Sequence, residues 1–130
     1  MTIIKPRVFV VTNNTDVNNL IAGMLWLKGT DPYKFSNAQD CIQKFKEMEG
    51  KVDVVLAGAE IASDRESMLI VNVKKINPNT KILAIGDANT HKTRILDYGA
   101  DEFSLVPLSP ENVADKVFML ISREAVEDNR

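Results

Sequence analysis

The sequence predicts an α/β fold in which helices cover both faces of a parallel sheet. Short, continuous apolar runs such as residues 8–11 alternate along the chain with longer segments of helical period. Strands that are buried on both faces have this composition, because crossover helices cover each side of a parallel sheet. The chain has 130 residues, of which 45% are hydrophobic, and this is enough for one domain with a core of its own.

A first strand and a first helix are predicted before residue 30. The strand covers residues 8–11. Thr15 or Asp16 can cap the following helix, and Gly29 can end it. The apolar side chains of this helix recur at helical spacing, and they are Val17, Leu20, Ile21, Met24 and Leu25.

Two more strand–helix units follow. A weak strand over residues 33–36 precedes a helix that Asn37 can cap and Gly50 can close. The buried side of this helix is predicted to consist of Ala38, Cys41, Ile42 and Phe45. A buried strand over residues 52–56 leads through a loop to a third helix over residues 64–76, and Pro78 stands just after its end.

The last part of the chain repeats this alternation twice. We predict strands over residues 81–85 and 102–105. A short helix over residues 90–97 is predicted between them, and it ends before Gly99. Ser109 suits the N-cap of a final helix, and Pro110 suits its first position. The apolar stripe of that helix is predicted to be Val113, Val117, Leu120 and Ile121.

Five strands that alternate with helices in so short a chain favour the flavodoxin-like strand order 2-1-3-4-5. We expect one domain over residues 1–130, with its core over about 7–123 and a polar tail over 124–130. Functional groups in such sheets lie beyond the carboxyl ends of the strands, near the point where the strand order reverses. The residues at those ends are Thr12-Asn13-Asn14, Gly58, Gly86-Asp87 and Val106-Pro107.

Charge and cysteine content narrow the classes of function. The formal net charge is -2 and no run of Lys or Arg occurs, so we expect neither a nucleic acid nor a membrane as partner. The N-terminal segment has no apolar stretch typical of a signal peptide, and no apolar run is long enough to span a bilayer. Cys41 is the one cysteine, which is typical of a reducing compartment, and we expect a cytoplasmic protein.

Several segments resemble parts of a known family. They are Val52-Asp53-Val54-Val55-Leu56, then Tyr98-Gly99-Ala100-Asp101-Glu102-Phe103, Val106-Pro107 and Ser109-Pro110-Glu111. Together they resemble a response-regulator receiver domain of the CheY-like family, over residues 7–121. The resemblance implies a CheY-like fold and a role in signal transduction, within a two-component system or phosphorelay.

The residues that carry phosphorylation in active receivers are missing here. The family's first strand ends in two acids that hold Mg²⁺, its third in the aspartate that accepts the phosphoryl group, its fourth in Ser or Thr, and its fifth in lysine. The matching positions in this chain are Thr12, Asn13, Gly58, Gly86 and Val106. Mg²⁺ prefers carboxylate oxygens, and a glycine supplies no nucleophile. Phosphoryl transfer depends on positioning and charge neutralisation, and this chain has lost the groups for both.

We therefore expect a pseudo-receiver that has no catalytic residue, metal or cofactor and that acts by binding a protein partner. Phe103 takes the position of the family's switch aromatic, although it can equally be a packed strand residue. Pro107 resembles the family's proline after a cis peptide bond. Trp26 is predicted to face solvent, either as a partner anchor or lying flat over its own helix.

The resemblance also implies a contact or homodimer surface. In receivers this surface is formed by the fourth helix, the fifth strand and the fifth helix. Here it would include His91, Arg94, Phe103 and Met119.

Two alternatives stay open at this point. The chain can be a small flavodoxin-like cofactor binder, in which residues 12–15 form a phosphate loop at a helix N-terminus, although the usual glycine is absent. It can also be a receiver with a relocated acid site, in which Glu60 or Asp87 accepts a phosphoryl group or binds an ion.

Overall fold

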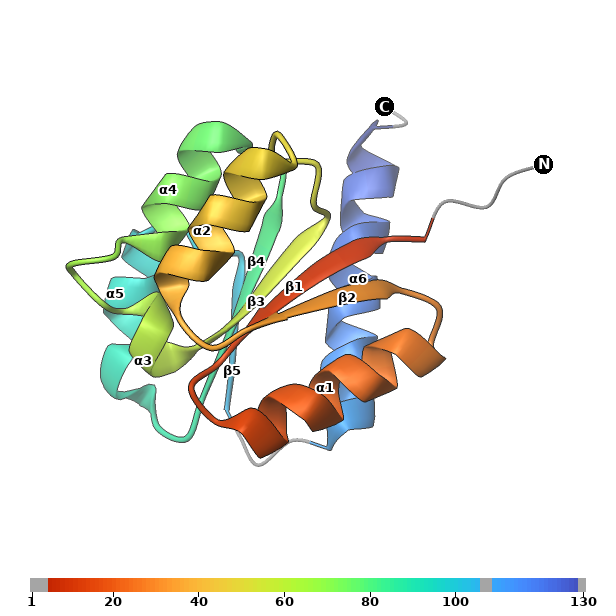
Figure 1. The fold of residues 1–130 in the computed structure, drawn as a ribbon, viewed down its shortest axis with the longest axis horizontal. Coiled ribbons are helices and arrows are strands. Elements are labelled where there is room, and N and C mark those ends of the chain that lie inside the picture. The colour runs from red at the N-terminus through yellow and green to blue at the C-terminus, as the bar shows by residue number, and fades with distance from the viewer. Residues whose placement is uncertain (1–4, 106–108, 129–130) are drawn as a thin grey trace.

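The computed structural model describes residues 5–105 and 109–128 of the chain. At its centre is a five-stranded parallel sheet of order β2-β1-β3-β4-β5 (Figure 1). The strands are β1 (Arg7–Val11), β2 (Asp31–Phe35), β3 (Val54–Gly58), β4 (Lys81–Gly86) and β5 (Glu102–Leu105). The predicted α/β fold and strand order are confirmed.

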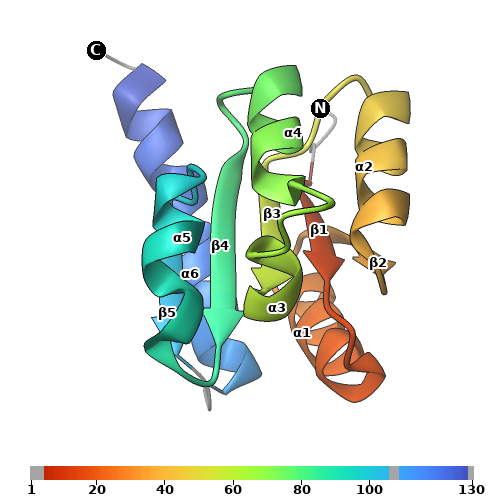
Figure 2. The ribbon, with the colours of Figure 1, turned by 90° about the vertical axis from the view of Figure 1, so that its left-hand side faces the viewer.

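Helices cover both faces of the sheet (Figures 1 and 2). One face is covered by α1 (Thr15–Leu27) and α6 (Pro110–Asp128). The other face is covered by α2 (Ala38–Glu47), α3 (Ala59–Ala62), α4 (Leu69–Ile76) and α5 (Lys92–Asp97), which a short 3-10 turn, η1 (Asn89–His91), precedes. None of the helices in the described part of the chain is long and apolar enough to cross a membrane.

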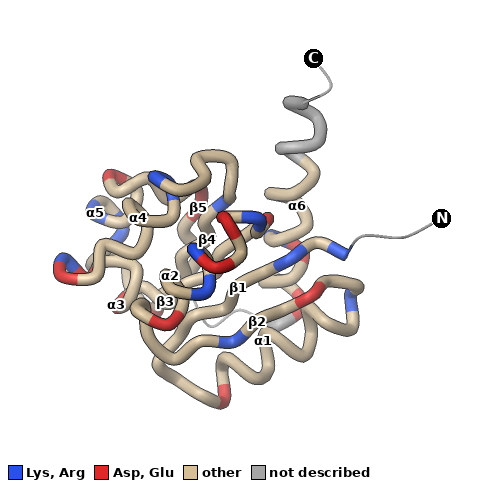
Figure 3. Tube along the Cα trace, turned by 45° about the horizontal axis from the view of Figure 1, so that its top comes forward, with Lys and Arg blue, Asp and Glu red and all other residues tan. Residues whose placement is uncertain are grey.

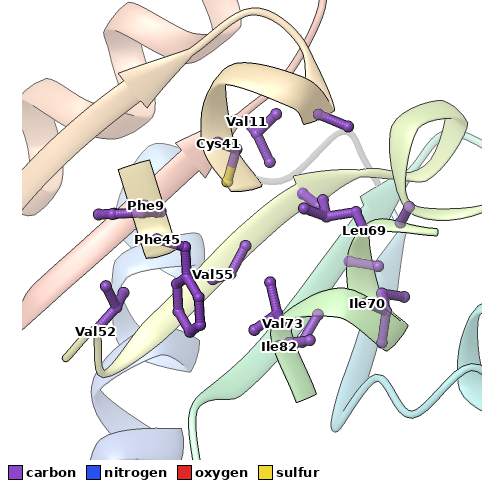
Figure 4. Packing of buried hydrophobic residues seen from close by; sticks show 14 of the residues in the cluster. Phe9, Val11, Cys41, Phe45, Val52, Val55, Leu69, Ile70, Val73 and Ile82 are labelled. Carbon is purple, nitrogen blue, oxygen red and sulfur yellow. The ribbon is translucent and has the colours of Figure 1, made fainter. Parts of the chain in front are cut away.

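Each central strand supplies side chains to two separate cores. Phe9 and Val11 pack with α2 and α4, whereas Val8 and Val10 pack with α1 and α6 on the opposite face. Figure 4 shows the first core, in which the rings of Phe9 and Phe45 meet edge to face with centroids 6.1 Å apart. Because both faces of β1 are covered, its sequence is a continuous apolar run and does not alternate.

Cys41 belongs to the first core and is fully buried there (Figure 4). Burial raises the pKa of its thiol to about 12, because the apolar surroundings disfavour the thiolate. The residue therefore packs as a small apolar side chain and is a poor nucleophile at neutral pH.

Helix α1 differs from its prediction at two positions. Its N-cap is Asn14, whose side-chain oxygen accepts a hydrogen bond from the backbone N–H of Val17 at 3.1 Å, and not Thr15 or Asp16. Leu20 lies outside the core, with 61% of its surface exposed. The helix turns Leu20 away because its buried side is formed by Asn18, Ile21, Ala22 and Leu25.

Asn18 is the polar member of that buried side, and it ties α1 to the sheet. Its amide nitrogen donates to the backbone oxygen of Val10 at 3.3 Å and to that of Phe35 at 3.0 Å. These two oxygens belong to the carboxyl-terminal ends of β1 and β2. Helix α1 is therefore held beside the sheet edge where the functional residues were predicted.

The prediction of a third helix over residues 64–76 is wrong for its first five residues. The carboxylate of Asp64 accepts hydrogen bonds from the backbone N–H groups of Glu66 and Ser67 at 3.2 and 3.3 Å, and these bonds form a local turn. The bond from Glu66 is the main reason that the pKa of Asp64 lies below its ordinary value. Met68 then has a left-handed backbone, with φ of 48°, and α4 begins only at Leu69.

Two aspartates tie strands together at the amino-terminal end of the sheet. The carboxylate of Asp53 accepts from the backbone N–H of Arg7 at 2.8 Å, so Asp53 lies at the start of β3, away from the functional edge. The carboxylate of Asp101 accepts from the N–H of Ile82 at 2.8 Å and from the Lys74 ammonium at 2.9 Å. The Gly-Ala-Asp segment thus has a structural role in this chain.

The remaining boundaries lie close to the predictions. Helix α2 begins directly after its predicted cap, Asn37. The Asn37 side chain accepts a hydrogen bond from the backbone N–H of Asp40 at 2.8 Å. Strand β3 covers residues 54–58 and not 52–56, so Gly58 is its last residue. Ser109 caps α6 by accepting from the N–H of Asn112 at 3.1 Å. Val106, Pro107 and the predicted cis bond between them lie outside the described residues.

Candidate functional site

The carboxyl ends of β1, β3 and β4 meet in one place. Val11 is in register with Ala57, and Gly58 is in register with Ile85. The residues at these ends, Thr12, Asn13, Gly58 and Gly86, all line one pocket. The structure therefore brings together four of the five positions predicted to be a degenerate phosphorylation site. The fifth, Val106, lies outside the described residues.

The pocket has a volume of about 510 Å³, and most of the side chains around it are apolar. Its apolar walls come from α1, α3, β4 and α6, and they are Val17, Leu20, Ile21, Ala59, Ile61, Ile85 and Val113. Its polar residues are Thr12, Asn13, Asn14, Glu60 and Asp87. The place where an active receiver holds a charged metal site is thus largely apolar here.

The two residues after β1 offer only neutral groups, and both already have partners. The Thr12 hydroxyl is buried and donates to the backbone oxygen of Asn14 at 3.0 Å. The Asn13 amide donates to the Glu60 carboxylate at 2.9 Å. Neither side chain presents the carboxylate oxygen that Mg²⁺ prefers.

The two glycines of the site differ in the space around them. A Cβ atom on Gly58 would have the Thr12 side chain as its nearest neighbour, at 3.8 Å, which is an ordinary contact. A Cβ atom on Gly86 would lie 2.8 Å from Cβ of Ala59 and 3.3 Å from the ring of Phe103. A side chain therefore fits at Gly58, whereas Gly86 is closed to one unless Ala59 or Phe103 moves.

Phe103 is half-buried, and it packs against the core formed with α2 and α4. Its ring tip occupies the space over Gly86. The side chain therefore fills the volume beside the position where active receivers carry a hydroxyl. Its role as a switch remains a prediction.

Two carboxylates stand at the rim of the pocket. Glu60 is on α3, directly after β3, and Asp87 directly follows β4; both are exposed. Within the described part of the chain, no group of three or more His, Cys, Asp or Glu side chains is placed to hold a metal ion.

The predicted partner residues lie on two sides of the sheet. Trp26 on α1 is 62% exposed, as predicted, and Met119 on α6 is 40% exposed. His91 and Arg94 lie on the other face and line a second, more open depression together with Glu60. Strand β5 is an edge strand of the sheet and carries Phe103.

Sequence reasoning predicted the exposed Trp26 on α1 but did not predict that Leu20 is exposed as well. Leu20 and Leu27 are 61% and 72% exposed, and they point in nearly the same direction because seven residues make almost two helical turns. Asp16 is the one charged residue of α1, and Figure 3 shows the stretch after it without charge as far as Lys28. The signal was the seven-residue spacing, which indicates a second apolar stripe beside the buried one.

The packing around the two glycines can be tested by substituting each of them with alanine, which adds one methyl group. We expect Gly86→Ala to lower the free energy of unfolding by about 1–3 kcal/mol, because the new Cβ overpacks against Ala59 and Phe103. Gly58→Ala should be neutral or stabilising by up to about 1 kcal/mol, because its backbone suits alanine and space is free. Urea unfolding measures both, and equal stability of the two variants would contradict the packing described here.

No protein-family model matches the sequence, and no curated protein matches it either. Its structure nevertheless resembles solved response regulators. A CheY-like receiver domain protein from Methanospirillum hungatei JF-1 has 18% identity and a TM-score of 0.81, over 95% of this chain and 98% of that one.

Two further structures have the same architecture. An orphan response regulator of H. pylori has 17% identity and a TM-score of 0.74, over 89% of this chain and 96% of that one. The beryllofluoride-activated NtrC4 receiver domain dimer has 18% identity and a TM-score of 0.78, over 91% of this chain and 98% of that one. With its strand order and its strand-end site, the chain has the CheY-like fold of response-regulator receiver domains.

Proposed function

We propose that this chain is a signalling module of the pseudo-receiver type, which binds a protein partner without being phosphorylated. The observation that carries the proposal is Gly58, the last residue of β3. The receiver resemblance assigns the phosphoryl-accepting aspartate to this position. Glycine has no side-chain oxygen, so no acyl phosphate can form there.

The groups around Gly58 support the same conclusion. Thr12 and Asn13 supply neutral oxygen and nitrogen atoms to the space where Mg²⁺ would be held. Gly86 has no hydroxyl, and its surroundings leave no room for one. Catalysis of phosphoryl transfer depends on positioned cations and donors, and these residues supply none.

A relocated acid is the competing proposal, and the charges at the rim disfavour it. Glu60 and Asp87 are the ionisable side chains among the described residues of the pocket, and both are anionic when ionised. The Glu60 carboxylate is also engaged with the Asn13 amide. A phosphoryl donor would approach two negative charges with no positive side chain from the described lining to offset them.

A partner surface is available on the edge formed by α5, β5 and α6. Leu96, Leu105 and Met119 lie on these three elements and are 40%, 45% and 40% exposed. Exposed apolar side chains beside an edge strand favour association with another chain. We propose this edge as the place of self-association, and the exposed apolar side of α1 around Trp26 as a contact for a different protein.

Phosphorylation independence can be tested by titrating the protein with Mg²⁺ and beryllofluoride, a mimic of the bound phosphoryl group. We expect no saturable change in the backbone amide signals of Gly58 and Gly86 or in Trp26 fluorescence, because Gly58 has no carboxylate to hold the mimic. Mg²⁺ alone and fluoride alone are the controls for the protein, and an active receiver is the positive control. Saturable shifts at the strand ends would contradict the proposal, and Glu60→Gln and Asp87→Asn would then identify the acid.

Self-association is tested by sedimentation equilibrium over a range of protein concentrations. We expect a concentration-dependent dimer that Leu105→Lys abolishes, because the new charge would be buried against the partner's edge. Trp26→Ser is the matched control, since it removes an exposed apolar side chain from α1, which is not one of the three elements of the proposed surface. A protein that stays monomeric at every concentration, or a dimer that Leu105→Lys leaves intact, would refute this interface.

A further inference from the structure

The strand-end pocket has the dimensions of a small-molecule site. Its volume of about 510 Å³ falls within the range of about 300–1,000 Å³ that is typical of ligand pockets in proteins. Such pockets are mostly apolar and carry a few polar groups that orient the ligand. The walls here are apolar side chains from α1, α3, β4 and α6, and the rim carries two carboxylates.

Two residues make the pocket accessible to a ligand, Leu20 and Gly58. Leu20 is 61% exposed and lines the pocket, so it forms an accessible apolar wall. Gly58 presents only backbone to the pocket, and the nearest atom to a Cβ built there would be 3.8 Å away. The loss of the acceptor side chain therefore leaves space that an apolar group can enter.

The charges around the pocket are of one sign. Among the described lining residues, Glu60 and Asp87 are the ionisable side chains, and no Lys, Arg or His accompanies them. The basic side chains Arg65, His91 and Arg94 line the second depression, which shares Asn13 and Glu60 with the pocket, and they are not among the described lining residues of the pocket itself. The rim therefore attracts a cation and repels an anion.

A phosphate-bearing cofactor does not suit this pocket. The backbone N–H of Val17 at the start of α1 is bonded to the Asn14 side chain and cannot also bind a phosphate. The two carboxylates at the rim would repel its charge. The engaged N–H of Val17 and the two rim carboxylates therefore disfavour the flavodoxin-like alternative.

We propose that the pocket binds a small organic amine with an apolar body, such as an aryl-alkyl ammonium compound. The apolar body lies among Leu20, Ile21 and Val113, and the ammonium group lies at the rim beside Glu60 and Asp87. This inference goes beyond the proposed function, because it gives the protein-binding module a small-molecule input. It does not depend on whether the domain dimerises.

The test uses three probes that share one apolar body: 4-phenylbutylamine, 4-phenylbutanol and 4-phenylbutyrate. Each is titrated into the full chain while the backbone amide signals are followed. We expect saturable shifts at Leu20, Gly58 and Gly86, with the amine binding about fivefold more tightly than the alcohol, which corresponds to about 1 kcal/mol of ion pairing. The carboxylate probe should bind more weakly than the alcohol.

Variants separate the apolar and the charged contributions. Gly58→Leu fills the pocket and should abolish binding of all three probes. Leu20→Ser should weaken binding of the amine several-fold, whereas Leu27→Ser, on the same side of α1 but outside the pocket, should leave it unchanged. The double substitution Glu60→Gln and Asp87→Asn should bring the affinity for the amine down to that for the alcohol.

Three results would overturn the inference. They are the absence of saturable shifts with every probe, equal affinity for the amine and the carboxylate, and equal effects of Leu20→Ser and Leu27→Ser. Cooperative urea unfolding of each variant shows that it is folded. Because these probes contain no phosphoryl mimic, their failure would leave the beryllofluoride result unaffected, and the two proposals can fail separately.

Discussion

The parallel, in-register pairing of β1, β3 and β4 is the constraint on which the site depends. It brings Thr12, Gly58 and Gly86 to one edge of the sheet, although 46 and 28 residues of chain separate them. The pairing is held from both faces, because alternate side chains of each strand enter two cores with different helices. The chemistry at that edge therefore follows from which side chains stand there, while the scaffold that presents them is intact.

The packing at the strand ends differs between Gly86 and Gly58. Ala59 and Phe103 occupy the volume into which a side chain at position 86 would project. A side chain at position 86 would therefore require movement of residues on α3 and β5. At Gly58 the reverse holds, since space is free, and this space continues into an apolar pocket. Among the described residues, this edge of the sheet is therefore largely apolar.

Much of this arrangement could be predicted from local signals in the sequence. Continuous apolar runs predicted the buried strands, and Asn37 and Ser109 predicted two helix starts, because caps act within a single turn. The break at Asp64 was missed because its side chain stabilises a turn that competes with a helix of suitable pattern. The pocket was also missed, because the direction of Leu20 depends on Asn18, whose partners lie on β1 and β2. Such contacts between distant segments leave no periodic signal.

The most direct test of the central claim is the intact mass of the protein after incubation with acetyl phosphate and Mg²⁺. The account predicts an unchanged mass at every donor concentration and time, because Gly58 offers no carboxylate and Thr12 and Asn13 offer none to a metal ion. A stoichiometric gain of one phosphoryl group that hydroxylamine removes would contradict it, since that lability is characteristic of an acyl phosphate. The acceptor would then have to be an acid at the rim, and the domain would be a phosphorylation switch.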